Sequence, residues 1–203
     1  MEIDHIAVTS TTLEAGAEAV EAALGVRLQP GGRHDLMGTH NRLLGLGDVY
    51  LEVIAVDPAA TAPGRPRWFD MDSFAGRPRL TNWIARCDDL AAEVAAAPAG
   101  VGVPVAFTRG DLAWQMAVPI DGRLPFDGCY PALIQWAGAA HPVQRLEDRG
   151  CRLQRLEIAH PEAAALRAAL AGRLTDPRVA IVAGATKAMR AEIATPHGLR
   201  VLE

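Results

Sequence analysis

Two short apolar segments of the chain each carry one side chain that can bind a metal ion or move a proton. His5 lies within Ile3–Val8, and Glu52 lies within Tyr50–Ala55. An unpaired charge buried in an apolar strand costs several kcal/mol (order of magnitude), so such a carboxylate is expected to have a partner. The pair therefore indicates a divalent metal site, an acid–base pair, or a hydrogen-bonded His–Glu pair that serves the structure.

Strand alternation predicts how these side chains are aimed. Tyr50, Glu52 and Ile54 fall on one face of a strand, and His5 shares a face with Ala7. If both faces line one cleft, His5 and Glu52 can meet there.

The elements that position this pair are repeated three times. Each repeat opens with a short apolar strand, followed by a helix-capping residue and an alanine-rich helix. The expected helix starts are Thr11 or Thr12, Asp88 or Asp89, and Pro161 as a first helical residue. The glycines expected to close the helices or the turns after them are Gly25, Gly100 and Gly172.

Three strand-like segments follow each helix. We expect them at about 31–36, 39–46 and 48–56, at about 103–109, 112–119 and 131–137, and at about 178–183, 188–194 and 199–203. The chain thus predicts an α+β protein of tandem βαβββ modules. Their ranges are 1–57, 77–138 and 151–203, with linkers at 58–76 and 139–150.

Tandem βαβββ modules with His on the first strand and Glu on the fourth resemble the vicinal oxygen chelate superfamily, and within it the glyoxalase-like domain proteins. The resemblance covers nearly the whole chain. It is carried by Asp4–Val8, His34, Gly38–Asn41, Tyr50–Glu52, Leu133–Trp136 and Ala194–Gly198.

The resemblance implies that two modules pair so that their curled mixed sheets form a cleft. A divalent metal in such a cleft takes ligands from the first and fourth strands of both modules and acts as a Lewis acid. Carried over to this chain, the metal ligands are His5 and Glu52, which are also the catalytic candidates, with Gln135 from the second module. Trp83 stands where a second histidine is expected, so the four-ligand pattern is incomplete.

Further candidates surround this pair. His40 and Asn41 are expected to contact a substrate, and Arg109 can bind a carboxylate through two hydrogen bonds. His34 is an alternative ligand, while a turn or surface role is the other interpretation of these polar residues. Trp83 forms, with Trp114 and Trp136, either an apolar wall for a ligand or part of the core.

Composition excludes several classes of function. The formal net charge of −4 gives no basic surface for nucleic acid. No apolar run reaches the length of about 20 residues that a membrane span needs. Three widely spaced cysteines without a CxxC motif are typical of a reduced, cytoplasmic protein. No nucleophile elbow, P-loop, dinucleotide fingerprint or HExxH motif occurs.

Two functions therefore remain in view. The first is an enzyme of the glyoxalase-like type that acts on a small metabolite, with a divalent metal or an acid–base pair at His5 and Glu52. The alternative is a metal-free module of the same superfamily that binds or sequesters a small molecule; a decayed site in a structural protein is a weaker possibility. The third module either packs behind the first two or pairs with its counterpart in a homodimer, and we favour the homodimer because an unpaired curled sheet exposes apolar surface.

Overall fold

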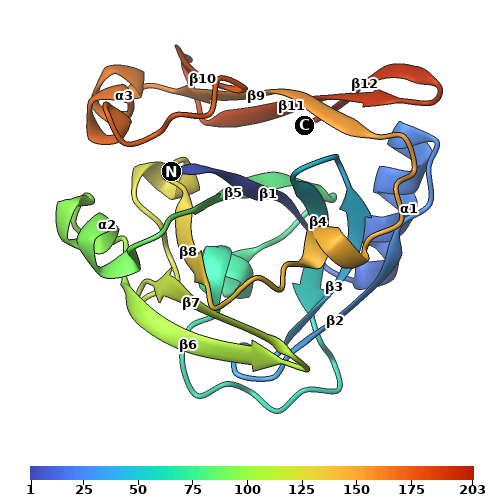
Figure 1. Cartoon of the computed structure of the whole chain (residues 1–203), viewed down its shortest axis with the longest axis horizontal. Helices are drawn as coiled ribbons and strands as arrows, with labels where there is room; N and C mark the ends of the chain where they lie inside the picture. Colours follow the sequence, from blue (N-terminus) through green and yellow to red (C-terminus); the bar gives the residue numbers. More distant parts are fainter.

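The computed structural model describes all residues, 1–203, as two sheets stacked in layers (Figure 1). The larger sheet has eight strands in the order β2-β3-β4-β1-β5-β8-β7-β6 and is strongly curled. The smaller sheet, drawn in orange and red, has the order β10-β9-β11-β12 and lies across the back of the larger one. The α+β class and the curled mixed sheet predicted from the sequence are confirmed.

Two similar halves make up the large sheet. The first half contains β1 (Glu2–Thr9), α1 (Leu13–Leu24), β2 (Gln29–His34), β3 (Thr39–Gly45) and β4 (Tyr50–Val56). The second half contains β5 (Arg79–Arg86), α2 (Leu90–Ala96), β6 (Val103–Arg109), β7 (Leu112–Val118) and β8 (Ala132–Trp136). In each half the first strand pairs in parallel with the fourth, and β1 and β5 join the halves as antiparallel neighbours.

The third unit has the same order of elements along the chain but a different pairing. It contains β9 (Arg152–His160), α3 (Ala163–Leu170), β10 (Val179–Ala183), β11 (Ala188–Thr195) and β12 (Gly198–Leu202). Here the first strand, β9, lies in the middle of the sheet, parallel to β10 on one side and antiparallel to β11 on the other. The third unit therefore does not repeat the strand order of the first two.

One helix boundary differs from the sequence prediction. Helix α3 begins at Ala163 rather than at Pro161, because the His160 side chain accepts a hydrogen bond from the Glu162 backbone N–H (3.0 Å) and holds that segment as a turn. Helix α2 ends at Ala96, because Ala97 precedes a proline and is extended (φ −80°, ψ 162°), and Gly100 lies in the turn that follows, as predicted. Helix α1 matches the prediction, with Thr12 as N-cap and Gly25 in the left-handed conformation at its end.

The large sheet has an apolar core on each of its faces. The outer core joins β1, β4 and β5 to α1 and to the inner face of the small sheet. The inner core lies inside the curl and is completed by the 3₁₀ segment Trp68–Ser73 of the connection between β4 and β5 (Figure 1). A second 3₁₀ segment, Phe126–Gly128, lies between β7 and β8, and a third, Pro142–Arg145, belongs to the connection between the two sheets. No helix is long and apolar enough to cross a membrane.

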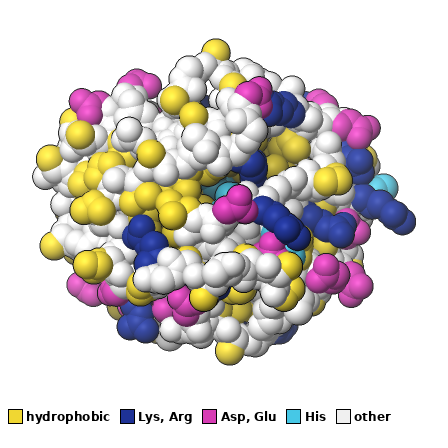
Figure 2. All heavy atoms as spheres, turned by 90° about the horizontal axis from the view of Figure 1, so that it is seen from below, with side chains coloured by type: hydrophobic (Ala, Val, Ile, Leu, Met, Phe, Trp, Pro, Cys, Tyr) yellow, Lys and Arg dark blue, Asp and Glu magenta, His cyan; other side chains and the backbone are white.

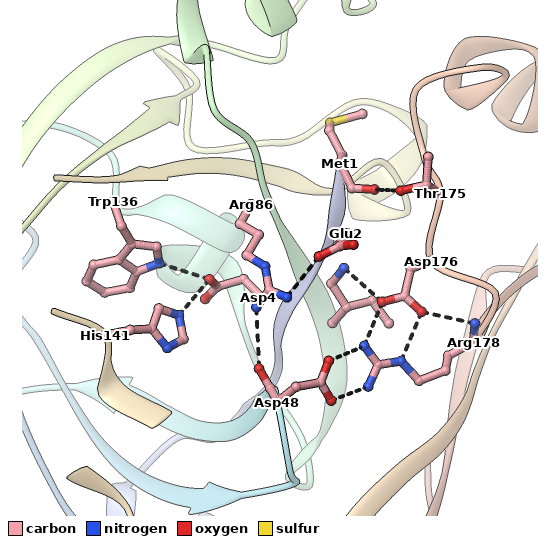
Figure 3. A network of polar contacts seen from close by, with 11 residues as sticks. Met1, Glu2, Asp4, Asp48, Arg86, Trp136, His141, Thr175, Asp176 and Arg178 are labelled. Carbon is pink, nitrogen blue, oxygen red and sulfur yellow. Dashed lines mark hydrogen bonds and ion pairs between the residues drawn. The ribbon is translucent and has the colours of Figure 1, made fainter. Parts of the chain in front are cut away.

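A buried ion pair ties the small sheet to the large one (Figure 3). Asp176 accepts hydrogen bonds from the backbone N–H of Ile3 (3.2 Å) and from Arg178, whose guanidinium also holds both oxygens of Asp48 (2.8 Å each). The Asp176 carboxylate is almost fully buried. Because it satisfies a backbone donor and a cation together, its loss leaves the Ile3 N–H without a partner and leaves Arg178 with Asp48 alone.

Replacing Asp176 with alanine is expected to lower the free energy of unfolding by about 2–4 kcal/mol, less than the roughly 3–5 kcal/mol for breaking a fully buried charge pair, because Arg178 keeps Asp48 as a partner. Urea unfolding followed by circular dichroism measures this change. The control variant is Arg155→Ala, which removes an exposed ion pair with Glu157 on the same small sheet and should change the stability by less than about 1 kcal/mol. Equal effects of the two variants would contradict the assigned role of Asp176.

Candidate functional site

The candidate site lies inside the curl of the large sheet. A β-bulge in β1 brings the side chains of two consecutive residues, Asp4 and His5, together there. The pairing of β1 with β5 shifts between Ile3 and His5, so Asp4 is an extra residue in the strand. As a result Ile3 and Ile6 both face the outer core, while Asp4 and His5, although adjacent in sequence, form a side-chain hydrogen bond of 2.6 Å.

The Asp4 carboxylate is completely buried and holds three donors. One oxygen accepts from His5 Nδ1, and the other accepts from Trp136 Nε1 (2.8 Å) and His141 Nε2 (2.9 Å; Figure 3). Burial alone raises the pKa of Asp4, but the hydrogen bonds from His141 and His5 outweigh it and hold the pKa well below its usual range. Asp4 is therefore a fixed negative charge beneath His5.

His5 is held between two carboxylates. Its Nδ1 donates to Asp4, and its Nε2 lies 3.6 Å from Oε2 of Glu52, which is beyond hydrogen-bond length. Burial lowers the pKa of His5, but the bond to Asp4 and the charge of Glu52 together raise it to about 9. The Tyr50 ring stacks on the imidazole at 4.4 Å. At neutral pH His5 is thus an imidazolium whose Nε2–H has no acceptor within hydrogen-bond distance.

Glu52 is oriented by Asn41. The Asn41 amide nitrogen donates to Oε1 of Glu52 (2.5 Å), while its oxygen accepts from the Gly32 backbone N–H (2.7 Å), which fixes the way the amide faces. Burial opposes the charge of Glu52, yet His5 and Asn41 lower its pKa to about 2. Oε2 of Glu52 therefore stays a carboxylate oxygen free to meet a ligand.

His34 completes the polar wall as a neutral imidazole. A guanidinium can only donate, so the 3.3 Å contact makes His34 Nε2 the acceptor from Arg109, and Nδ1 then donates to Thr39 (3.0 Å). Burial lowers the pKa of His34 to about 4, and the positive charges of Arg109 and His5 act in the same direction. Arg109 itself forms no ion pair with a carboxylate.

The pocket over these groups has a cavity volume of about 30 Å³, room for about two water molecules, so a larger ligand enters only if the side chains that close it shift. Its other walls are aromatic or aliphatic. They are formed by Leu43, Tyr50, Trp68, Phe69, Trp114, Met116, Ile134 and Trp136. Figure 2 shows that basic and acidic side chains are interleaved over the face of the molecule seen from below.

Not all predicted site residues meet in this pocket. His5, Glu52, Asn41 and Arg109 line it, as does His34. His40 does not, because it alternates with Asn41 and faces the other side of β3.

Trp83 and Gln135 also lie on the other face of the sheet. Trp83 is buried in the outer core and donates to the Cys129 carbonyl (2.9 Å), and Gln135 caps the start of α2 through the Leu90 N–H and the Asp88 carbonyl. The sequence alignment was wrong by one residue. His5 pairs with Ile84. The parallel registers of β1 with β4 and of β5 with β8 then make Ile134 of the second half the position equivalent to Glu52 of the first.

Sequence reasoning missed Asp4, His141, Trp68 and Phe69 as parts of the site. Asp4 could have been noticed, since a carboxylate in an apolar strand needs a partner. Regular strand alternation, however, predicts that Asp4 lies on the face of the strand opposite to His5. His141, Trp68 and Phe69 lie in the two segments predicted as linkers, 139–150 and 58–76.

The donor atoms present do not fit a divalent metal ion. His5 Nε2 and Glu52 Oε2 are two candidate ligands, but the second half of the sheet offers Ile84 and Ile134 at the matching positions. No group of three or more His, Cys, Asp or Glu side chains is arranged to hold a metal. The guanidinium of Arg109, which lines the same pocket, also opposes a divalent cation in this space.

Residues 3–174 match the glyoxalase-like domain family, and the chain belongs to that family. This confirms the resemblance to the vicinal oxygen chelate superfamily. The match ends before β10, so the last three strands lie outside it. No curated protein matches the chain.

Solved structures are similar to the chain at low sequence identity, and the first of them shares its fold. A hypothetical protein from Staphylococcus aureus is 16% identical with a TM-score of 0.58, over 83% of this chain and 73% of its own. Methylmalonyl-CoA epimerase from Mycobacterium tuberculosis is 16% identical with a TM-score of 0.43, over 68% of this chain and 88% of its own. The Streptomyces coelicolor epimerase (Q60A) in complex with 2-nitronate-propionyl-CoA is 15% identical with a TM-score of 0.41, over 68% and 97%.

The His5 charge predicts a pH dependence of stability. The folded chain keeps the His5 proton up to a pKa of about 9, whereas the model-peptide pKa is 6.5. The resulting stabilisation, about 3 kcal/mol, is complete below pH 6.5 and is lost as the pH rises through 9. His34 does not contribute in this window, because its folded pKa of about 4 leaves it neutral in both states above pH 6.5.

Urea unfolding between pH 6.5 and 8.5 should therefore show a falling free energy of unfolding in the wild type and in His40→Gln. The fall should be absent from His5→Gln. NMR titration of the His5 imidazole gives the same pKa without a variant. A midpoint near 6.5 would contradict the charge assignment.

Proposed function

We propose that the pocket binds a small organic molecule that carries an acceptor oxygen beside a hydrogen it can release, and that His5 and Glu52 transfer a proton on it. One observation supports this most: the His5 Nε2–H and the Glu52 Oε2 face the pocket 3.6 Å apart without a hydrogen bond between them. An atom of a ligand can reach a donor and an acceptor at the same place.

The two groups have complementary roles. His5, charged at neutral pH, donates to an oxygen on which negative charge develops, and Asp4 beneath it keeps the proton on the ring. Glu52 accepts the proton from the neighbouring atom of the ligand. Its pKa of about 2 makes it a weak base in the free protein, and a negatively charged ligand oxygen nearby raises that pKa toward a useful range.

Arg109 supports an acidic ligand. Its guanidinium lines the pocket, is packed against Gly32, and is engaged by the neutral His34 ring rather than by a carboxylate. A ligand carboxylate can replace that neutral partner with a charge-assisted, two-bond contact. The aromatic walls then hold the apolar part of the ligand and exclude water.

Glu52→Gln should keep binding of small 2-hydroxy and 2-oxo acids within a few-fold and reduce proton exchange on the bound acid by about 100-fold or more. Arg109→Gln should weaken binding by about 10-fold. Calorimetry measures the binding, and NMR in D₂O measures exchange at C2 of the 2-hydroxy acids and at C3, beside the ketone, of the 2-oxo acids.

His40→Gln is the matched control, since His40 lies on the same strand as Asn41 but outside the pocket. Exchange that persists in Glu52→Gln would exclude Glu52 as the base. Binding without exchange in the wild type would favour the second candidate, a binding module without turnover, for which the aromatic walls alone suffice.

The metal content of the protein distinguishes this metal-free function from a metal-dependent one. The donor set predicts well below one equivalent of Mn, Fe, Ni, Zn or Mg after incubation and gel filtration, in both the wild type and Glu52→Ala. Elemental analysis measures the metal content. Near-stoichiometric metal that is lost in Glu52→Ala would overturn the metal-free mechanism.

The homodimer and the cytoplasmic location stay predictions. The apolar face of the third unit, which motivated the homodimer, is covered within the chain because Leu156, Ile158 and Ile193 belong to the outer core.

A further inference from the structure

A second cavity lies on the other side of Phe69 from the pocket. It has a cavity volume of about 400 Å³ and is open to solvent. Phe69 lines both cavities. We call this cavity the Lys187 crevice; the charged and amide side chains that line it are Asp70, Arg79, Asn82, Arg123, Asp127 and Lys187.

Three cations converge on the crevice from separate parts of the chain. Arg79 starts β5, Arg123 lies between β7 and β8, and Lys187 lies in the turn before β11 of the small sheet. Lys187 is the single lysine among 203 residues. The crevice is therefore assembled only when both sheets are in place.

Two of these cations have no carboxylate partner. Arg123 pairs with Asp70 (3.2 Å). Lys187 donates to the backbone carbonyl of Asp127 (2.5 Å), while the Asp127 carboxylate lies toward His160 (3.5 Å). Arg79 is bonded only to backbone carbonyls and stacks over a phenylalanine ring.

The unpaired cations are close enough to affect each other. Loss of surrounding water lowers the pKa of Lys187, and the positive charge of Arg79 adds to that lowering, while Cys129, Asp127 and Asp70 oppose it. An anion bound between Lys187 and Arg79 would relieve the repulsion between these two cations.

The backbone around the crevice is held in unusual conformations. Apart from glycines, positive φ occurs only at Phe69, Asp70, Phe126 and Asp127, between 52° and 60°. Three of these four residues line the crevice. The connection between β7 and β8, which contains Phe126 and Asp127, is joined to the Phe69–Asp70 segment by the hydrogen bond from the Asp70 N–H to the Gly122 carbonyl (2.9 Å). Such strain persists where surrounding structure enforces it and is concentrated at ligand-binding sites.

We propose that the Lys187 crevice is a second ligand site, which binds a phosphate-type oxyanion between Lys187, Arg79 and the free nitrogens of Arg123. The anion is either free phosphate or the phosphate group of an organic ligand that reaches past Phe69 toward the pocket. Both sources share the chemistry of a tetrahedral dianion, for which lysine and arginine are suited binding groups.

The single lysine makes a direct test possible. The wild type is acylated with a low dose of an amine-reactive ester, and mass spectrometry of peptides measures the rate at Lys187. Inorganic phosphate should slow this rate several-fold and saturably, whereas sodium chloride at the same ionic strength should not. Arg79→Gln should weaken the protection, and the neighbouring exposed Arg77→Gln should leave it unchanged.

Arg190→Lys supplies a control lysine that lies outside the crevice. Phosphate should leave its rate unchanged while Lys187 in the same molecule is protected. Equal protection of both lysines, or equal protection by chloride, would overturn the proposal, as would the absence of protection. Glu52→Gln should retain full protection, so failure of the proton-transfer function and failure of this site are distinguishable.

The same measurement with 3-phosphoglycerate separates the two sources. Protection that is stronger than with inorganic phosphate and is reduced by Arg109→Gln supports a ligand that spans both cavities. Protection equal to that of inorganic phosphate and unchanged in Arg109→Gln supports free phosphate as the occupant of the site.

Discussion

The buried carboxylate of Asp4 is the constraint on which the site depends. A charge with no exposure to water must be compensated by donors, and here those donors are two histidines and a tryptophan from three parts of the chain. His5 comes from the same strand, Trp136 from β8, and His141 from the connection to the small sheet. The need to satisfy Asp4 thus holds the two halves of the large sheet and the inter-sheet connection in one arrangement, and the proton on His5 follows from it.

The curl of the large sheet encloses the polar residues that Asp4 holds in place. Its outer core is covered by α1 and by the small sheet, so the inner face is left to hold the polar chain from Asp4 through His5 to Glu52 and Asn41. The segment with Trp68 and Phe69 enters the curl and closes it with aromatic surface. Electrostatic interactions are stronger in such a water-poor space, which is why the imidazolium and the carboxylate can persist side by side.

Much of the fold was predictable because it rests on periodic patterns. The alternation in Tyr50–Val56 correctly aimed Glu52 and Tyr50 together, and Thr12 and Gly25 marked the ends of α1. The bulge at Asp4 was not predictable, since a one-residue insertion in pairing leaves no trace in composition. The same limit explains Trp83 and Gln135: a shift of one residue in aligning the two halves moved both to the wrong face. Pairing partners, not local sequence, also decide that β9 is central in its sheet.

The correct register changes what the two halves contribute. In the first half, the inner face carries His5 and Glu52; in the second, the matching positions carry Ile84 and Ile134. Two symmetric half-sites would together surround a metal ion, whereas one polar half facing one apolar half surrounds an amphipathic molecule. Under the proposed function this difference orients the ligand, with its oxygen toward His5 and Arg109 and its apolar part against Ile134 and Trp114. The asymmetry between the related halves is then the physical basis on which that proposal expects a single orientation.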